Sequence, residues 1–309
     1  MKQKHLLSLK DYSRADIEDI LELARKVKSR PGDYRKALEG KTLAMIFQKP
    51  STRTRVSFEV GMYQLGGHAL FLGADAIQLN RGETVPDTAR VLSRFVDGIM
   101  ARVFAHQDIL DLARHATVPV INGLSDLLHP CQVLADLFTL FERRGGLEGL
   151  KIAYVGDGNN VCHELMFAAV KLGMAMSVAS PPGYEPNQLI VKSATRDAQK
   201  SNRSGPEVTS DPKEAVKGAD VVYTDVWTSM GQEAEAPARA KAFQGFMVDQ
   251  ALMARAEPDA VFMHCLPAHR GEEVAAEVID GPRSVVLDEA ENRLHVQKAL
   301  MVLLMSPPG

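Results

Sequence analysis

The chain is poor in cysteine and has no long apolar run. Its three cysteines, Cys131, Cys162 and Cys265, are too few and too far apart for a disulfide framework or a zinc knot, so we expect free thiols in a reducing cytosol. No apolar stretch approaches the ~20 residues that span a bilayer. The amino-terminal residues also turn polar too soon for a signal peptide. These absences argue against a secreted or membrane protein and predict a cytoplasmic one.

Neither sign of charge is in large excess. A formal net charge of −3 gives no electrostatic case for binding nucleic acid, which usually requires a strongly basic face. A hydrophobic content of 45% and a charged content of 24% are typical of a globular protein. The length of 309 residues suits two domains of about 150 residues each.

Apolar strand patterns alternate with amphipathic helix patterns along the whole chain, and Gly145-Gly146 ends a long helix in the middle of it. Two successive series of this kind predict an α/β protein with two domains, each built on a parallel, helix-flanked sheet. We expect the domains at 1–145 and 146–290, with the helix at 291–309 packing back onto the first. The expected strands are 43–47, 68–72, 98–104, 118–121, 152–155, 176–179, 221–224, 260–263 and 285–287.

Polar loops follow most of these strands. Ligands of parallel sheets bind beyond the carboxyl ends of the strands, so we expect an active site in one shared cleft between the domains. Helices are expected after a capping signal at Ser13, and after residue 51, where Val56, Val60 and Tyr63 recur at helical spacing.

The turn after the first strand carries three hydroxyls and two arginines: Ser51, Thr52, Arg53, Thr54 and Arg55. Free backbone N–H groups and the helix dipole favour an anion at such a strand-to-helix turn, and arginine grips phosphate oxygens in a bidentate way. A solvated, charged helix start is the alternative interpretation. The spaced glycines of a Walker A loop are missing, so a nucleoside triphosphate is not expected.

A second polar segment, His129-Pro130-Cys131-Gln132, lies where a loop enters the long helix. Histidine can donate to a carbonyl oxygen, and glutamine can accept from an amide-like NH₂. A helix cap with proline in the first turn is the alternative. Gln78 and Arg102 belong to the same half of the chain and could reach the same cleft.

The turn Gly156-x-Gly158 suggests a dinucleotide site but lacks the other marks of one. Val161 stands where the third glycine is needed, and the next strand ends in Ala179-Ser180 without the acidic residue that would hold a ribose. We therefore reject NAD. The turn offers the amides of Asn159 and Asn160 instead.

Two further strand ends carry reactive groups. Asp225 can hold an ammonium group or take a proton from it, and the small, polar residues 228–240 suggest a loop that closes over a substrate. Cys265, beside His264, could be a nucleophile or an inert packed thiol. We prefer a positioning and proton-handling role for Cys265 over covalent catalysis.

Together these motifs resemble the ornithine carbamoyltransferases within the aspartate/ornithine transcarbamoylase family, and the match runs essentially end to end. Residues 51–55 and 129–132 are similar to the carbamoyl-phosphate motifs of the whole family. Asp225 with 229–231, and 264–267, are similar to motifs of the ornithine enzymes. Gln48 departs from the pattern, because the family commonly has Glu there.

The resemblance implies transfer of the carbamoyl group from carbamoyl phosphate to the δ-amine of L-ornithine, giving L-citrulline and phosphate. It implies no metal or organic cofactor, and a homotrimer or a multimer of trimers. The catalytic residues would be Arg102, His129, Asp225 and Cys265. Carbamoyl phosphate would be bound by Ser51, Thr52, Arg53, Thr54, Gln78, Arg102, His129, Gln132, Cys265, Leu266 and Arg293, and ornithine by Asn160, Asp225, Ser229 and Met230.

Three alternatives remain beside this interpretation. A sister enzyme could use aspartate or an acylated ornithine, but an aspartate enzyme should present extra cationic residues for the second carboxylate. A non-catalytic family member should have lost Arg53, His129 or Cys265, and all three are present. A nucleotide-binding oxidoreductase conflicts with the turn at Gly156.

Overall fold

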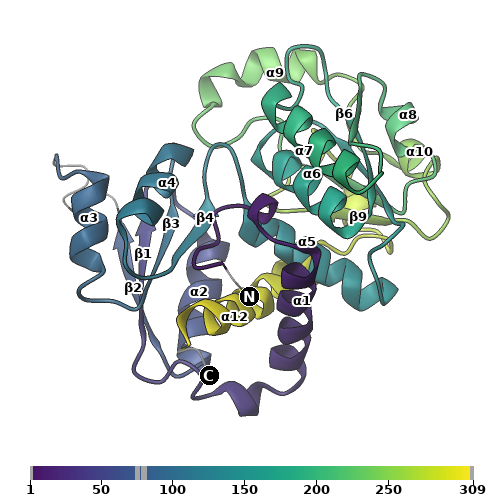
Figure 1. Cartoon of the computed structure of the whole chain (residues 1–309). Helices are drawn as coiled ribbons and strands as arrows, with labels where there is room; N and C mark the ends of the chain where they lie inside the picture. The colour runs from purple at the N-terminus through teal and green to yellow at the C-terminus, as the bar shows by residue number, and fades with distance from the viewer. Residues whose placement is uncertain (1–2, 74–76, 78–81, 307–309) are drawn as a thin grey trace. The chain divides into compact units, whose positions relative to one another are not determined.

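The computed structural model describes residues 3–73, 77 and 82–306. The chain forms two compact units, one of Met1–Phe138 with Glu291–Gly309 and one of Thr139–Ala290. Each unit is an α/β layer structure built on its own parallel sheet (Figure 1). No helix of the described residues is long and apolar enough to cross a membrane.

The sheet of the first unit has the strand order β2-β1-β3-β4, and all three strand pairs are parallel. One face packs on α3 and α4 through the apolar cluster that includes Ile46, Ile99 and Ile109. Helices α2 and α12 meet where Gly61 approaches Met301. The elements are α1 (Arg14–Ser29), β1 (Thr42–Phe47), α2 (Thr52–Gln64), β2 (His68–Gly73), α3 (Val85–Leu92), β3 (Gly98–Arg102), α4 (His106–His115), β4 (Val120–Leu124), α5 (Pro130–Arg144) and α12 (Val286–Met305).

The sheet of the second unit has the order β7-β6-β5-β8-β9, again with parallel pairs throughout. Residues of β5, β8 and β9 form one core with α8, α10 and α11, and α6 packs with α7. The elements are β5 (Lys151–Val155), α6 (Asn160–Leu172), β6 (Ala175–Ala179), α7 (Gln188–Lys200), β7 (Glu207–Thr209), α8 (Pro212–Val216), β8 (Val221–Thr224), α9 (Ala236–Ala242), α10 (Gln250–Met253), β9 (Val261–His264) and α11 (Ala276–Ile279).

The prediction of two parallel, helix-flanked sheets is confirmed. The cap at Ser13 is confirmed as well, because its side chain accepts from the Asp16 N–H and Asp16 bonds back in a capping box. The strand expected at 285–287 is wrong. The backbone there pairs briefly with Phe262, through the Val285 N–H, and then begins α12 at Val286. The short edge strand β7 was not predicted.

The apolar stripe predicted for α2 is also wrong. The helix forms, but Val56 is 51% and Tyr63 82% exposed. Its buried residues include Phe58, Gly61 and Met62 instead. Gly61 explains the choice of face, because an added Cβ would lie 2.9 Å from Met301 Cε of α12. The helix therefore turns the face with Phe58, Gly61 and Met62 inward and leaves Val56 and Tyr63 outside.

Candidate functional site

The start of α2 has the geometry of an anion site. Ser51 is its N-cap, with the side-chain oxygen accepting from the Thr54 N–H at 3.2 Å. The first N–H groups of a helix have no partner within it and point out of its end. Arg53 is half-buried in this first turn and makes no ion pair with any described residue. A partly desolvated guanidinium beside free N–H groups suits an anionic ligand.

The second arginine of the turn has a structural role. Arg55 pairs with Glu59 at 2.9 Å and lies over the Phe71 ring at 3.8 Å. Of the two arginines, Arg53 is therefore the one left for the predicted anion, in keeping with the expected set of phosphate contacts, which includes Arg53 and omits Arg55.

Arg293 of α12 joins two of the predicted site residues. It is 3% exposed, and it donates to Thr54 Oγ1 at 2.6 Å and to Gln132 Oε1 at 2.9 Å. Gln132 in turn donates to Asp136 Oδ1 at 2.8 Å. Because Thr54 Oγ1 accepts from Arg293, its own hydrogen is directed elsewhere. A substrate NH₂ would share the Gln132 oxygen with Arg293.

His129 and Arg102 are buried in the same unit, at 4% and 8% exposure. Burial lowers the pKa of His129 well below its ordinary value, and the positive charges of Arg293 and Arg102 lower it further. The imidazole is therefore neutral at pH 7. Its Nδ1 atom is buried without a hydrogen-bond partner among the described residues. This atom is therefore available for a hydrogen bond to a ligand.

Gln48 follows β1, and its backbone N–H donates to the Arg102 carbonyl at 2.8 Å. Its amide donates to Asp108 at 3.2 Å and accepts from the Phe104 N–H at 2.9 Å. A glutamate could not donate to Asp108, so the neutral amide fits this neighbour. Gln78 lies outside the described residues.

In the second unit, three side chains from three loops meet at Asp225. Asn159 donates to Asp225 Oδ2 at 2.7 Å, and the Cys265 thiol donates to Oδ1 at 2.9 Å. The Val226 N–H also donates to Oδ1. Asp225 is 6% exposed, so these donors hold a nearly buried carboxylate in one orientation. A carboxylate fixed in this way can receive an ammonium group.

The segment Cys265-Leu266 is held by a buried histidine. His264 Nδ1 accepts from the Leu266 N–H at 2.9 Å, so its other nitrogen carries the proton and donates to Glu273 at 3.1 Å. His264 and Glu273 are fully buried. Leu266 has φ +56°, a conformation that is unfavourable for a residue with a side chain. The pair thus stabilises the backbone that presents the Cys265 and Leu266 carbonyls.

Packing accounts for the two glycines of the turn after β5. Gly156 has φ +141°, and a Cβ at Gly158 would collide with the backbone of Pro186. Asn159 caps α6, accepting from two N–H groups. The turn therefore needs its glycines without any dinucleotide, in line with the rejection of NAD.

Asp157, between these glycines, should make stability depend on pH. Burial raises the pKa of Asp157 from 3.8 to about 6, although Arg239 opposes the shift. The folded state then binds this proton more tightly than the unfolded chain does, so the free energy of unfolding should fall as pH rises from about 4 to about 6. Asp157→Asn should flatten this slope by up to about 1.4 kcal/mol per pH unit. Urea titrations at several pH values measure the free energy of unfolding and hence its slope against pH. Equal slopes in the wild type and Asp157→Asn would contradict the prediction.

The remaining predicted ornithine residues follow the same two strands, β5 and β8, as Asn159 and Asp225 do. Asn160 is the first residue of α6, directly after Asn159. The Ser229 N–H donates to Gln232, and Met230 is 44% exposed. Neither Ser229 nor Met230 is hydrogen-bonded by its side chain to Asp225. The contact of Asn159 with Asp225 was missed, and its position beside Asn160 in a strand-end turn was the available signal.

Two groups of side chains in the second unit have metal-ligand chemistry: Asp225, His264 and Cys265, and His269, Glu272 and Glu273. In the first group both nitrogens of His264 are already hydrogen-bonded. A metal ion there would cost one of these bonds, and we assign it none.

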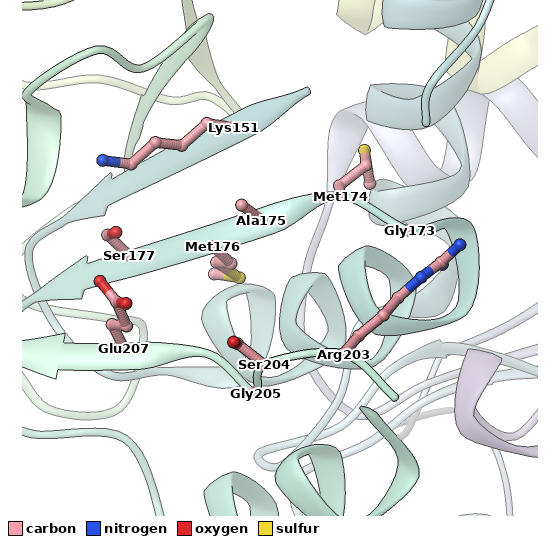
Figure 2. A pocket seen from close by; sticks show the side chains of 10 residues that line it. All are labelled: Lys151, Gly173, Met174, Ala175, Met176, Ser177, Arg203, Ser204, Gly205 and Glu207. Carbon is pink, nitrogen blue, oxygen red and sulfur yellow. The ribbon is translucent and has the colours of Figure 1, made fainter. Parts of the chain in front are cut away.

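A hollow of about 470 Å³ lies at the amino ends of β5, β6 and β7 (Figure 2). Arg203 in its wall pairs with Glu148 at 2.7 Å, and Lys151 donates to the Lys217 carbonyl at 2.7 Å. Parallel sheets bind ligands at the opposite, carboxyl ends of their strands. With its cations already bonded, this hollow is a poor candidate for the substrate site.

Comparisons with known proteins match both halves of the chain. The family model described as the carbamoyl-P binding domain of aspartate/ornithine carbamoyltransferase matches residues 4–142. The model for the Asp/Orn binding domain matches residues 148–304.

Relatives match over nearly the whole chain. The ornithine carbamoyltransferase of Thermococcus kodakarensis is 60% identical over 304 residues, which are 98% of this chain and 96% of that protein. The solved ornithine carbamoyltransferase of Pyrococcus furiosus has 59% identity and a TM-score of 0.94, covering 99% of this chain and 98% of that one. That of Thermus thermophilus has 46% identity and a TM-score of 0.89, covering 99% and 100%. The chain therefore belongs to the aspartate/ornithine carbamoyltransferase family.

Proposed function

We propose that this protein transfers the carbamoyl group from carbamoyl phosphate to the δ-amine of L-ornithine, giving L-citrulline and phosphate. The main structural reason to choose ornithine as the acceptor is the nearly buried Asp225 carboxylate, which accepts hydrogen bonds from Asn159 and Cys265. A fixed negative group suits a cationic amino acid and repels aspartate. The names of the relatives support the same acceptor.

The donor's phosphate would bind at the start of α2. Ser51, Thr52, Arg53 and Thr54 would surround it with hydroxyls, N–H groups and one guanidinium, and Gln78 would contribute its amide. Negative charge moves onto the phosphate as the carbamoyl bond breaks, so these contacts would strengthen along the reaction.

The carbamoyl carbonyl would be polarised by Arg102, His129 and Thr54. A neutral imidazole has one N–H, which can donate to the oxygen as negative charge develops on it. Arg293 would hold Thr54 and Gln132 in place through its two hydrogen bonds. The carbamoyl NH₂ would donate to Gln132 and to the backbone carbonyls of Cys265 and Leu266.

The acceptor would lie on Asn160, Ser229, Met230 and Asp225. Ornithine must lose a proton before it attacks, because its δ-ammonium has a pKa near that of lysine, about 10. Asp225 and Cys265 would orient the amine and handle this proton. Attack on the carbamoyl carbon gives a tetrahedral intermediate, which collapses with release of phosphate. Residues 233–240 of the loop expected at 228–240 instead form a 3-10 helix and the start of α9, so closure of the remaining part, 228–232, would exclude water from the reaction.

Serine in place of Cys265 should preserve much of the activity. In the structure the thiol donates to Asp225, and a hydroxyl can make the same bond. We expect the kcat of Cys265→Ser to stay within about tenfold of the wild type. The kcat of Cys265→Ala should be lower than that of Cys265→Ser. Steady-state citrulline formation measures both. A loss in Cys265→Ser as complete as in Cys265→Ala would favour a covalent thiolate mechanism instead.

The test of the proposed function is an assay of carbamoyl transfer. Carbamoyl phosphate is supplied with ornithine, aspartate or acetylornithine in parallel, and each carbamoylated product is quantified. We expect product with ornithine alone. No citrulline from folded protein would refute the proposal, and carbamoylaspartate or acetylcitrulline as the main product would assign a sister activity.

We further propose that the chain forms a homotrimer through its first unit. Val56 and Tyr63 of α2 and Leu70 and Phe71 of β2 are exposed, and β2 is an edge strand. Helix α2 packs on β2, so these side chains belong to neighbouring elements. Exposed apolar groups along a sheet edge favour association with another chain. Light scattering should give three times the 33.8 kDa chain mass, or a multiple of that.

A further inference from the structure

Arg239 of α9 is a buried arginine that connects three segments of the second unit. Only 7% of its side chain is exposed. Its Nη1 atom donates to the Trp227 carbonyl at 2.9 Å and lies 3.1 Å from Asp157 Oδ1. Its Nε atom donates to Glu235 at 2.9 Å. The guanidinium also lies over the Tyr184 ring, 4.9 Å from its centre.

Both segments that Arg239 joins lead directly to proposed ornithine contacts. Asp157 precedes Asn159, whose amide donates to Asp225. Trp227 follows Asp225 by two residues and precedes Ser229 by two residues. Arg239 therefore joins the two turns at positions two or three residues from the proposed acceptor contacts Asn160 and Ser229.

The aromatic side chains around it keep this connection rigid. Trp227 stacks on Phe243 with ring centres 5.5 Å apart, and Tyr184 lies 5.0 Å from the same ring. The loop is more open immediately beyond Trp227, where Met230 is 44% exposed and Gly231 has φ +94°. The base of the acceptor loop is thus fixed while its tip is accessible.

We propose that Arg239 is a positioning residue for the acceptor amino acid: by tying the Trp227 carbonyl to Asp157, it sets the distance between the turn at Asn159 and Asn160 and the loop at Asp225 and Ser229. This inference rests on the proposed function, since it assigns ornithine to those residues. It assigns a role to Arg239, which lies in the stretch 228–240 but is not among the predicted site residues.

Only arginine has the chemistry for this contact. Its planar fork presents donors in fixed directions and can stack on an aromatic ring at the same time. Lysine has one nitrogen and would have to choose among Asp157, Glu235 and the Trp227 carbonyl. An uncharged side chain would leave the Asp157 carboxylate buried and unpaired.

The test compares Arg239→Gln and Arg239→Lys with the wild type in steady-state kinetics. We expect Arg239→Gln to raise the KM for ornithine at least tenfold and to change the KM for carbamoyl phosphate less than twofold. The KM of Arg239→Lys for ornithine should lie between those of the wild type and Arg239→Gln. Glu235→Gln removes the exposed partner of Arg239 and leaves the Trp227 and Asp157 contacts, so both KM values should stay within twofold. Arg203→Gln, at the opposite end of the sheet, serves as the second control.

Trp227 gives an independent readout, because it is the one tryptophan of the chain. It is 9% exposed in the structure. In the ligand-free protein, Arg239→Gln should shift its emission to longer wavelength and increase quenching by acrylamide at least twofold, while both controls keep the wild-type spectrum. Below the unfolding temperature, a variant that is merely less stable is still folded and keeps the wild-type emission. A shifted emission in Arg239→Gln therefore reports a local change at Trp227.

The outcomes are distinct. An unchanged KM for ornithine in folded Arg239→Gln, or equal increases in both KM values, would overturn the positioning role while wild-type citrulline formation stands. If Arg239→Gln does not fold, Arg239→Lys provides the test. A wild-type KM for ornithine together with wild-type Trp227 emission in Arg239→Lys would then overturn the positioning role of Arg239. Absence of citrulline from the wild type would instead refute the proposed function.

Discussion

Arg53→Ala is expected to raise the KM for carbamoyl phosphate about 100-fold, which corresponds to about 2.7 kcal/mol. Arg53 lies at the first turn of α2, half-buried, and pairs with no described carboxylate. A charge-assisted, bidentate contact with phosphate is stronger than an ordinary hydrogen bond. Without Arg53, the negative charge of the phosphate leaving group is no longer balanced by a guanidinium. The value of kcat should fall too, because the phosphate gains charge in the transition state. Initial rates at varied carbamoyl phosphate measure both constants.

Arg55→Ala is the matched control for this experiment. It removes the same side chain two residues along the same helix, but Arg55 is occupied by Glu59 and Phe71. Its KM for carbamoyl phosphate should remain within threefold of the wild type, with the assembly state checked by light scattering. If the two variants behaved alike, the start of α2 would not be the phosphate site.

Asp225→Asn is expected to lower kcat/KM for ornithine by about 1,000-fold, or about 4 kcal/mol. The amide keeps the shape of the carboxylate but cannot accept from Asn159, Cys265 and Val226 together, because its nitrogen is a donor. It also loses the negative charge that would hold the δ-ammonium and favour loss of its proton. The KM for carbamoyl phosphate should change little. Raising the pH should partly restore the rate, since more ornithine is then neutral.

Asp249→Asn makes the same chemical change elsewhere in the second unit. Asp249 caps α10 by accepting from the Leu252 N–H, and asparagine caps a helix as well as aspartate does. This control should retain wild-type kinetics. An Asp225→Asn protein with normal kcat and normal KM for ornithine would remove Asp225 from the mechanism.

The sequence predicted the layers of the fold well, because periodicity and caps are local signals. Ser51 and Ser13 cap helices that begin one residue later, as their side chains suggest. The face of α2 was predicted wrongly, because Val56 and Tyr63 form as good a stripe as Phe58 and Met62. The choice depends on Gly61 and α12, which lies more than 200 residues further along the chain.

The site shows the same division between local and distant information. The start of α2 and the Asp225 loop could be found from residue type and position at strand ends. Arg293 came from family resemblance alone, because an arginine within a helix pattern suggests an exposed surface. Arg239 was missed for a different reason, because the small, polar residues 228–240 suggested a loop and not a helix with a buried arginine. Burial turns such a side chain into a fixed contact, and burial depends on the partners that tertiary structure supplies.

The bond between Arg293 and Thr54 spans 239 positions of the chain and has a consequence for synthesis on the ribosome. The second unit, Thr139–Ala290, is continuous and can close as soon as its last residue emerges. The first unit is begun first but lacks α12 until almost the whole chain has been translated. Its sheet can form early, yet Thr54 and Gln132 gain their shared arginine only at the end. The half of the protein that is made first is therefore completed last.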